Sequence, residues 1–208
     1  VLFVGETGTG KEFLARLYMS FSKRKGLKKT VNCASYPDAL LRSEIFGHVR
    51  GAYTDAIKDR CGKLKTCNGG VLFLDELTEF KKNVLEVMRQ PLEDRIVTIS
   101  RSKITVQYPC NFMLIAAMNP TPAGSQKEAS MYSDFDIQKF LSKISGPILD
   151  RIDLHIHVNP VKYQELSSKT ESEKSEKVRE RVIRAREIQI RRFSGRKGIY
   201  ANSAMGSK

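Results

Sequence analysis

The apolar residues of this chain follow two spacings that alternate along the sequence. Continuous apolar runs at 1–4, 71–74 and 112–118 are typical of strands covered on both faces of a parallel sheet. Between these runs, apolar residues recur at helical spacing over four segments, 11–25, 37–46, 81–93 and 134–144. This alternation predicts the α/β class, with a mainly parallel sheet flanked by helices.

Shorter segments add detail to this framework. Short strands are expected at 31–34 and 154–158, and Gly146-Pro147 is expected to end the preceding helix. Residues 47–62 show no clear period and are expected to form an extended surface loop.

Two β-rich runs at 96–100 and 104–108 predict a β-hairpin. Arg101 and Lys103 lie at its expected tip. They would suit contact with the phosphates of DNA, or they could simply keep a turn soluble.

A glycine-rich segment joins the first apolar run to the first predicted helix. Its residues are Gly5, Glu6, Thr7, Gly8, Thr9, Gly10, Lys11 and Glu12. The glycines let the backbone approach a polyphosphate, and the helix that begins at Lys11 adds the positive end of its dipole. Lys11 can reach the outer phosphates, whereas Glu12 stands where Ser or Thr usually contacts the metal. The order of strand, loop, lysine and helix favours a nucleotide-binding loop over a turn that binds nothing.

A second motif follows the buried run at 71–74, which ends in Asp75 and Glu76. Asp75 would hold Mg²⁺ through the ion's water shell, since Mg²⁺ dehydrates reluctantly. Glu76 would orient and polarise the attacking water. Alone, the pair could equally be the polar exit of a core strand, but beside the glycine-rich loop it predicts a site for ATP and Mg²⁺.

The composition narrows the setting of the protein. Its 208 residues suffice for one core and an appendage, and no segment resembles a signal peptide or a membrane span. The four cysteines lack paired spacing, which indicates free thiols in the cytoplasm. The net charge is +13, and residues 161–208 carry 13 Lys and Arg against 6 Asp and Glu. This tail, with a polar linker at 167–175 and a basic helix at 176–193, could contact DNA or be merely solvated.

Residues 1–76 resemble the central domain of bacterial enhancer-binding activators, which are AAA+ ATPases that remodel a sigma factor. The matching stretches are 5–12, Val31-Asn32-Cys33-Ala34, Glu44-Ile45-Phe46-Gly47-His48 and Gly51-Ala52-Tyr53-Thr54-Asp55-Ala56. Those activators also carry Glu after the lysine, so Glu12 is ordinary among them. The resemblance implies sigma-factor contact through loop 51–56, although Asp55 stands where they have Gly.

Residues 69–205 resemble the magnesium-chelatase-like proteins of the competence-related kind, which are AAA+ ATPases with a hairpin before the sensor strand. The matching stretches are 69–77, 89–93, 97–101, 116–120 and 144–153. A natural recombinant, a divergent intermediate or a mis-joined sequence would each give this double resemblance. Thr121 and Ala123 stand where that kind carries cysteines, so no metal site is carried over.

The resemblance assigns roles to two amides. Asn119 would be the sensor of the γ-phosphate, and Asn32 would hold Glu76 away from the water until the ring is engaged. The plainer alternative for Asn119 is a turn residue before Pro120.

Arg151 would be the arginine finger that enters the neighbouring subunit's site in a homo-oligomeric ring. The plainer alternative is a surface salt bridge with Asp150 or Asp153.

The resemblance also implies a domain organisation. Residues 1–160 would be an AAA+ core that begins, at Val1, without its N-terminal edge. Residues 161–208 would be a linker and a basic helix that lead toward a helical lid. The chain ends at Lys208, where that lid would begin, so we expect a fragment that lacks the lid and its second sensor arginine.

Several functions are compatible with these features. The first is an ATP-hydrolysing ring motor that moves the hairpin at 96–108 and the loop at 47–62 against DNA or a protein on DNA. The second is a transcription regulator that uses ATP to remodel a sigma factor. A hybrid module that binds nucleotide without turnover is a third, and magnesium insertion into a porphyrin is a weaker fourth.

Overall fold

The computed structural model describes residues 1–51, 57–100, 105–122, 132–161, 173–196, 199, 201–202 and 205. The chain divides into two compact units, Val1–Pro160 and Val161–Lys208, and each is described by itself.

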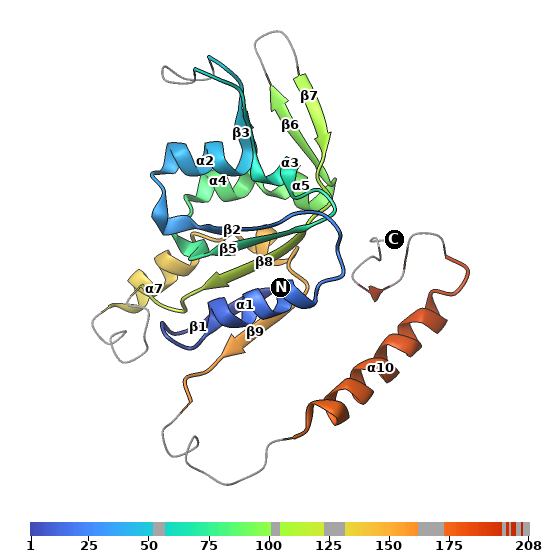
Figure 1. The fold of residues 1–208 in the computed structure, drawn as a ribbon. Coiled ribbons are helices and arrows are strands. Elements are labelled where there is room, and N and C mark those ends of the chain that lie inside the picture. The colour runs from blue at the N-terminus through green and yellow to red at the C-terminus, as the bar shows by residue number, and fades with distance from the viewer. Residues whose placement is uncertain are drawn as a thin grey trace. The chain divides into compact units, whose positions relative to one another are not determined.

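A five-stranded sheet forms the centre of the first unit (Figure 1). In spatial order its strands are β2 (Lys28–Asn32), β5 (Val71–Asp75), β8 (Met113–Met118), β1 (Leu2–Gly5) and β9 (His155–Val158). Every neighbouring pair is parallel, which confirms the predicted α/β class. Because parallel strands end at the same edge, the segments that follow β2, β5, β8 and β1 are brought together there.

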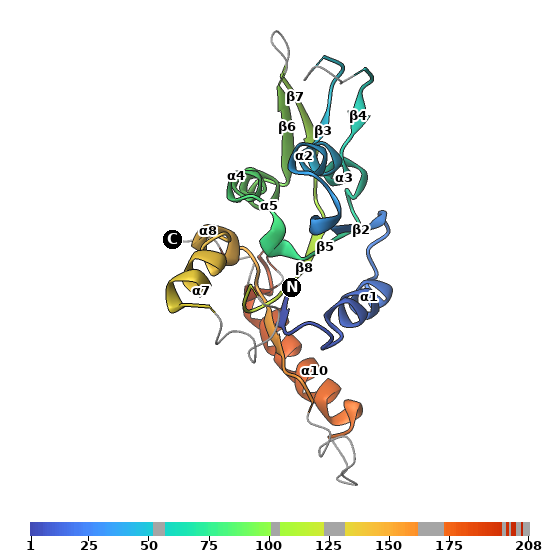
Figure 2. The same ribbon diagram turned by 90° about the vertical axis from the view of Figure 1, so that its left-hand side faces the viewer.

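Among the described residues, the helices of the first unit are α1 (Lys11–Phe21), α2 (Asp38–Phe46), α3 (Lys63–Thr66), α4 (Lys82–Val87), α5 (Arg89–Glu93), α7 (Asp134–Leu141) and α8 (Gly146–Leu149). Two 3₁₀ turns, η1 (Cys33–Ser35) and η2 (Leu77–Glu79), follow β2 and β5. Figure 2 shows α1 on one side of the sheet and α4, α7 and α8 on the other.

The strands alternate their side chains between two apolar clusters. Phe3 and Phe73 belong to a cluster that contains the α1 residues Ala15 and Met19. Leu72 and its like-facing neighbours belong to a larger cluster that contains residues of α2, α4 and α8. Both faces of the sheet are therefore buried, which explains why its strands are continuously apolar rather than alternating.

Some helix predictions need correction. α7 ends at Leu141, earlier than the predicted 144. α1 ends at Phe21, earlier than the predicted 25. The segment 81–93 forms two helices that meet at Met88. Gly146-Pro147 begins α8 instead of only ending a helix, because the fixed φ of proline suits a first helical turn.

Two antiparallel arms project from the same end of the first unit (Figure 1). In the first arm, β3 (Gly47–His48) pairs with β4 (Arg60–Cys61), so the two ends of the predicted loop are held together. The second arm is the predicted hairpin, formed by β6 (Ile96–Ser100) and β7 (Thr105–Pro109). Residues 52–56 and 101–104, which include Asp55, Arg101 and Lys103, lie outside the described residues.

The second unit contains α10 (Ser175–Arg192), which matches the predicted basic helix. None of the residues of α10 is buried, and this helix exposes five aliphatic side chains: Val178, Val182, Ile183, Ile188 and Ile190. Over the described ranges, no helix is both long and apolar enough to cross a membrane.

Candidate functional site

The glycine-rich loop connects β1 to α1 at the carboxyl edge of the sheet. Gly8 and Gly10 have φ of 81° and 84°, a left-handed conformation that other residues rarely adopt. A Cβ added at either position would meet nothing within 4 Å, so the loop backbone faces open space. Gly10 supplies no side-chain cap to α1, which leaves the first N–H groups of that helix to an outside acceptor.

The Lys11 ammonium lies at the centre of this loop. Its Nζ donates to the carbonyls of Gly5 and Glu6, each at 2.7 Å, and to Oδ1 of Asn119 at 3.0 Å. Burial lowers the pKa of Lys11, and the nearby carboxylates of Asp75 and Glu76 oppose that shift. A lysine that is partly desolvated and held only by neutral oxygens is suited to exchange them for phosphate oxygens.

Asp75 and Glu76 occupy the end of β5 as predicted. Oδ1 of Asp75 accepts a hydrogen bond from the Glu76 N–H at 3.0 Å, and Glu76 has a left-handed φ of 52°. Burial raises the pKa of both carboxyl groups; the charge of Glu12 adds to the shift at Asp75, and the charge of Asp75 adds to the shift at Glu76. Two neighbouring carboxyl groups with raised pKa values lie near the Lys11 ammonium at one edge of the sheet. Such a cluster of perturbed groups is a candidate functional site.

Asn32 ends β2 directly beside Asp75 in the strand register. Its Oδ1 accepts a hydrogen bond from the Ala34 N–H at 2.9 Å, so the side chain caps η1. In the described part of the chain no hydrogen bond joins Asn32 to Glu76, and its predicted restraint on Glu76 stays a prediction. Glu12 forms an exposed ion pair with Arg16, at 2.6 Å, on the first turns of α1.

Arg151 lies in the turn after α8. Its Nη1 donates to the Pro147 carbonyl at 2.8 Å, and its Nη2 pairs with the carboxylate of Glu93 at the end of α5. The salt bridge thus forms with a residue far away in the sequence, rather than with Asp150 or Asp153.

The residues at this edge fit a nucleoside triphosphate. Backbone donors, a helix N-terminus and a lysine converge where strand β1 ends, and Asn119, which directly follows the adjacent strand β8, contacts the lysine. The half-buried Asp75 carboxylate, with Glu12 nearby, suits a hard cation such as Mg²⁺. Within the described ranges no group of three or more His, Cys, Asp or Glu could hold a metal alone, so such an ion would rely on water and phosphate for most of its ligands.

Sequence reasoning missed two carboxylates that the fold brings to cations. Glu44 of α2 is buried, with 7% of its surface exposed, and it pairs with Arg60 of β4 and Lys63 of α3. Glu93 pairs with Arg151. Only the spacing of charged residues near predicted turns could have pointed to them, and that signal is weak.

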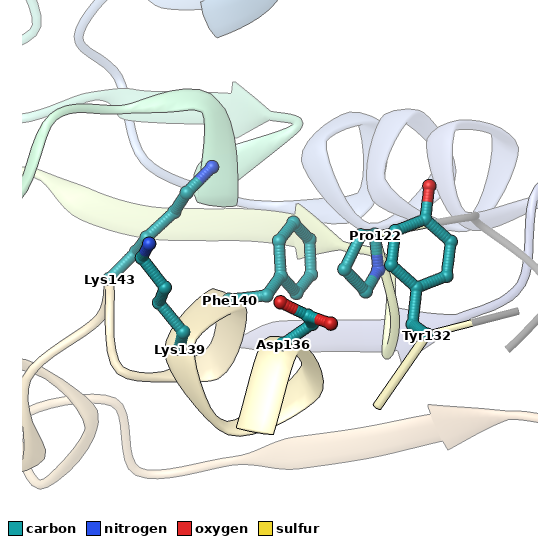
Figure 3. A pocket seen from close by; sticks show the side chains of 6 residues that line it. All are labelled: Pro122, Tyr132, Asp136, Lys139, Phe140 and Lys143. Atoms are coloured by element: carbon teal, nitrogen blue, oxygen red, sulfur yellow. The ribbon is translucent and has the colours of Figure 1, made fainter. Parts of the chain in front are cut away.

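A pocket of about 470 Å³ is lined by none of these residues. Pro122 and Tyr132 line one side of it and the α7 region lines the other, through Asp136, Lys139, Phe140 and Lys143 (Figure 3). The Asp136 carboxylate is already engaged, because it forms a capping box with Ser133 at the start of α7.

Known proteins similar to this chain fall into the two groups that the motifs indicated. Residues 51–166 match the family model described as magnesium chelatase, subunit ChlI. The competence protein ComM of Haemophilus influenzae is 35% identical over 98% of this chain and 43% of its own length. The Nif-specific regulatory protein of Azorhizobium caulinodans is 41% identical over 53% of this chain and 19% of its own length.

Solved structures resemble the fold. NtrX from Brucella abortus in complex with ATP superposes with a TM-score of 0.55 at 20% identity, over 76% of this chain and 30% of that one. This likeness, with the parallel sheet, shows an AAA+ P-loop fold.

The chain spans less than half of the length of these curated relatives. ComM matches both halves of it, so the two resemblances do not require a joined sequence. By its match over more than half of its residues, the chain belongs to the family of the magnesium chelatase subunit ChlI, among the AAA+ ATPases.

Proposed function

We propose that this chain is the ATP-hydrolysing core of a magnesium-chelatase-like ring motor that acts on DNA or on a protein bound to DNA. The observation that carries the proposal is the Lys11 ammonium, which contacts the phosphate-binding loop and Asn119 at once. A phosphate that replaces these oxygens around Lys11 would change the surroundings of Asn119. Asn119 can therefore report the state of the γ-phosphate to β8.

Glu76 is the residue that we assign to the attacking water. Its carboxylate would orient that water and polarise it toward the γ-phosphorus atom. Burial and Asp75 raise the pKa of Glu76, which makes its carboxylate a stronger base than an exposed one. Asn32, one strand away, would restrain Glu76 until a ring forms.

Asp75 is the residue that would hold Mg²⁺ through its water shell. When bound, the ion would neutralise charge on the phosphates. Lys11 and the N-terminus of α1 would add to the same effect, because the fold already places both at the loop.

Arg151 would complete the site of a neighbouring subunit. An arginine supplied in trans offsets the charge that develops on the transferred phosphoryl group, so turnover would depend on assembly of a homo-oligomeric ring. In this proposal residues 1–160 are the ATPase core, and 161–208 are the linker and basic helix that follow it.

The substrate would contact the arms. The hairpin β6–β7 projects from the core, and its sequence places Arg101 and Lys103 at the tip, where cations suit DNA phosphates. The basic helix α10 offers a second set of cations.

The test is ATP turnover of the complete protein with and without DNA, beside Glu76→Gln. We expect turnover that rises with DNA and disappears in the variant. Combined Arg101→Ala and Lys103→Ala should reduce the stimulation by DNA and leave basal turnover intact. Tight ATP binding without turnover in either condition would reject the motor, and equal loss of basal and stimulated turnover in the arm variant would reject the DNA contact.

Remodelling of a sigma factor is a second candidate, favoured by the 38% identity, over 57% of this chain, to the sigma54-dependent transcriptional activator SfnR of Pseudomonas putida. The first arm, β3–β4, carries the segment 51–56 that would make the contact. Asp55 weighs against it, because it adds a carboxylate to that segment. Turnover stimulated by a sigma factor and unaffected by DNA would favour this candidate.

A further inference from the structure

The Arg151 side chain is held on its own chain by two contacts. Nη2 pairs with Glu93, and Nη1 donates to the Pro147 carbonyl at 2.8 Å. Nε is buried, and among the described residues it has no hydrogen-bond partner. A guanidinium with a buried N–H and no acceptor is incompletely satisfied, and this favours an alternative position with more acceptors.

Glu93 stands at the root of the hairpin arm. It is the last residue of α5, and β6 begins at Ile96. Between them Arg95 has a left-handed φ of 58°, and its carbonyl accepts from the Cys110 N–H at 2.7 Å, which closes the base of the hairpin. A force on Glu93 is therefore applied beside the point where the hairpin joins the core.

The Arg151–Glu93 ion pair is too exposed to contribute much to folding stability. The side chain of Arg151 is 25% exposed and that of Glu93 is 44% exposed. Ion pairs with this much exposure contribute little to folding stability. The buried Glu44, by contrast, is enclosed by two cations at the root of the other arm.

We propose that Glu93 is a positioning residue for Arg151, an inference that rests on the proposed function. Glu93 holds the guanidinium on its own subunit, away from the neighbouring site. In the ring, the γ-phosphate of the neighbour competes for the same N–H groups, and Arg151 exchanges Glu93 for it. The exchange releases the root of the hairpin, so the nucleotide state of one subunit reaches the hairpin of the next.

The contacts connect Arg151 to the hairpin through a short series of elements. Arg151 follows α8, Glu93 ends α5, and the hairpin begins three residues later. Each step is a direct contact or a few residues of chain, and the moving part is a single ion pair with two alternative partners for the arginine.

The first experiment compares Glu93→Gln with wild type in the complete protein. Glutamine keeps the shape but removes the charge that holds Arg151. We expect basal kcat to rise, by up to about fivefold for one partly exposed ion pair, with KM for ATP unchanged. Glu86→Gln is the matched control, because Glu86 is comparably exposed on the adjacent helix and lies 4.0 Å from Arg89. A kcat that is unchanged or reduced in Glu93→Gln would overturn the proposal.

The second experiment measures hydrogen exchange at the base of the hairpin, in the peptide that contains Cys110. Glu93→Gln and Arg151→Ala should each speed exchange, and the double variant should be no faster than either. In wild type a non-hydrolysable ATP analogue should speed exchange in the same way, and in Glu93→Gln it should add nothing. Exchange that matches the Glu86→Gln control would overturn the link between the ion pair and the hairpin.

The two readouts separate this inference from the proposed function. If wild type lacks turnover, the proposed function fails, while the exchange data still decide whether Glu93 restrains the hairpin through Arg151. If Glu76→Gln abolishes turnover but Arg151→Ala does not reduce it, the ATPase stands and the positioning role of Glu93 is rejected.

Discussion

Two regions gather charged side chains. The phosphate-binding edge contains Lys11, Asp75 and Glu76, and the root of the first arm contains Glu44 with its two cations. The two regions differ in how far the charges are compensated within the chain. At the edge, burial raises the pKa of Asp75 and Glu76 and lowers that of Lys11, so each group is less stable in its charged form than in water. At the arm root, the buried Glu44 carboxylate is enclosed by two cations.

The difference separates charges placed for chemistry from charges placed for structure. The edge keeps charges that are incompletely compensated, because a bound nucleotide and its ion would compensate them. The arm root needs no ligand, since its carboxylate is compensated within the chain. Substitutions at the edge should therefore change activity far more than stability, and substitutions at the arm root should do the reverse.

The largest effect is expected for Lys11→Ala. It removes the contact with Asn119 and the cation that restrains the raised pKa of Asp75 and Glu76. Loss of one pre-organised charged donor typically costs about 100-fold or more in turnover. ATP affinity and turnover of the complete protein measure it, and Lys23→Ala, an exposed lysine just beyond α1, is the control. Binding of ATP by Lys11→Ala at the wild-type level would contradict the assignment of this edge.

The phosphate-binding edge could be predicted from the sequence, because its information is local. Residues 5–12 are contiguous, and Asp75 and Glu76 directly follow a strand that reads as buried. Parallel pairing then brings Asn119 to the same edge, since β8 lies between β1 and β5. The roles assigned to these residues stay predictions until the variants are measured.

The arm roots could not be predicted in this way. Glu44 meets Arg60 and Lys63 only when α2 packs beside a pair of two-residue strands, which carry no periodic signal. Glu93 and Arg151 are separated in the sequence by the hairpin, β8, α7 and α8, and the sequence favoured partners next to Arg151. Non-local ion pairs depend on tertiary packing, whereas the glycine-rich loop depends on its own backbone.

An intermediate effect, on stability, is expected for Glu44→Gln. The change leaves Lys63, whose side chain is 21% exposed, without its carboxylate, whereas the half-exposed Arg60 can turn toward water. We expect a loss of about 1–3 kcal/mol in the free energy of unfolding, below the range for a fully buried pair. Urea unfolding measures it. The control is Glu12→Gln, in an exposed pair on α1, which should cost no more than about 0.5 kcal/mol. An equal loss of stability in both variants would contradict the view that charges at the arm root stabilise the fold more than charges at the edge.

The smallest change in stability is expected for Asp75→Asn, which should stabilise the fold slightly although it removes turnover. Because the folded-state pKa of Asp75 is raised, its ionised form destabilises the native state above that pKa, and the destabilisation is absent below the usual aspartate range. Asparagine avoids the charge and can still accept from the Glu76 N–H. Asp75 is only half-buried, so solvent screening limits the gain to less than about 1 kcal/mol. Thermal unfolding should show the variant more stable at neutral pH, with the difference shrinking as the pH falls. A difference that grows toward acid pH would mean that Asp75 stabilises the fold as an ion, and the edge would then resemble the arm root.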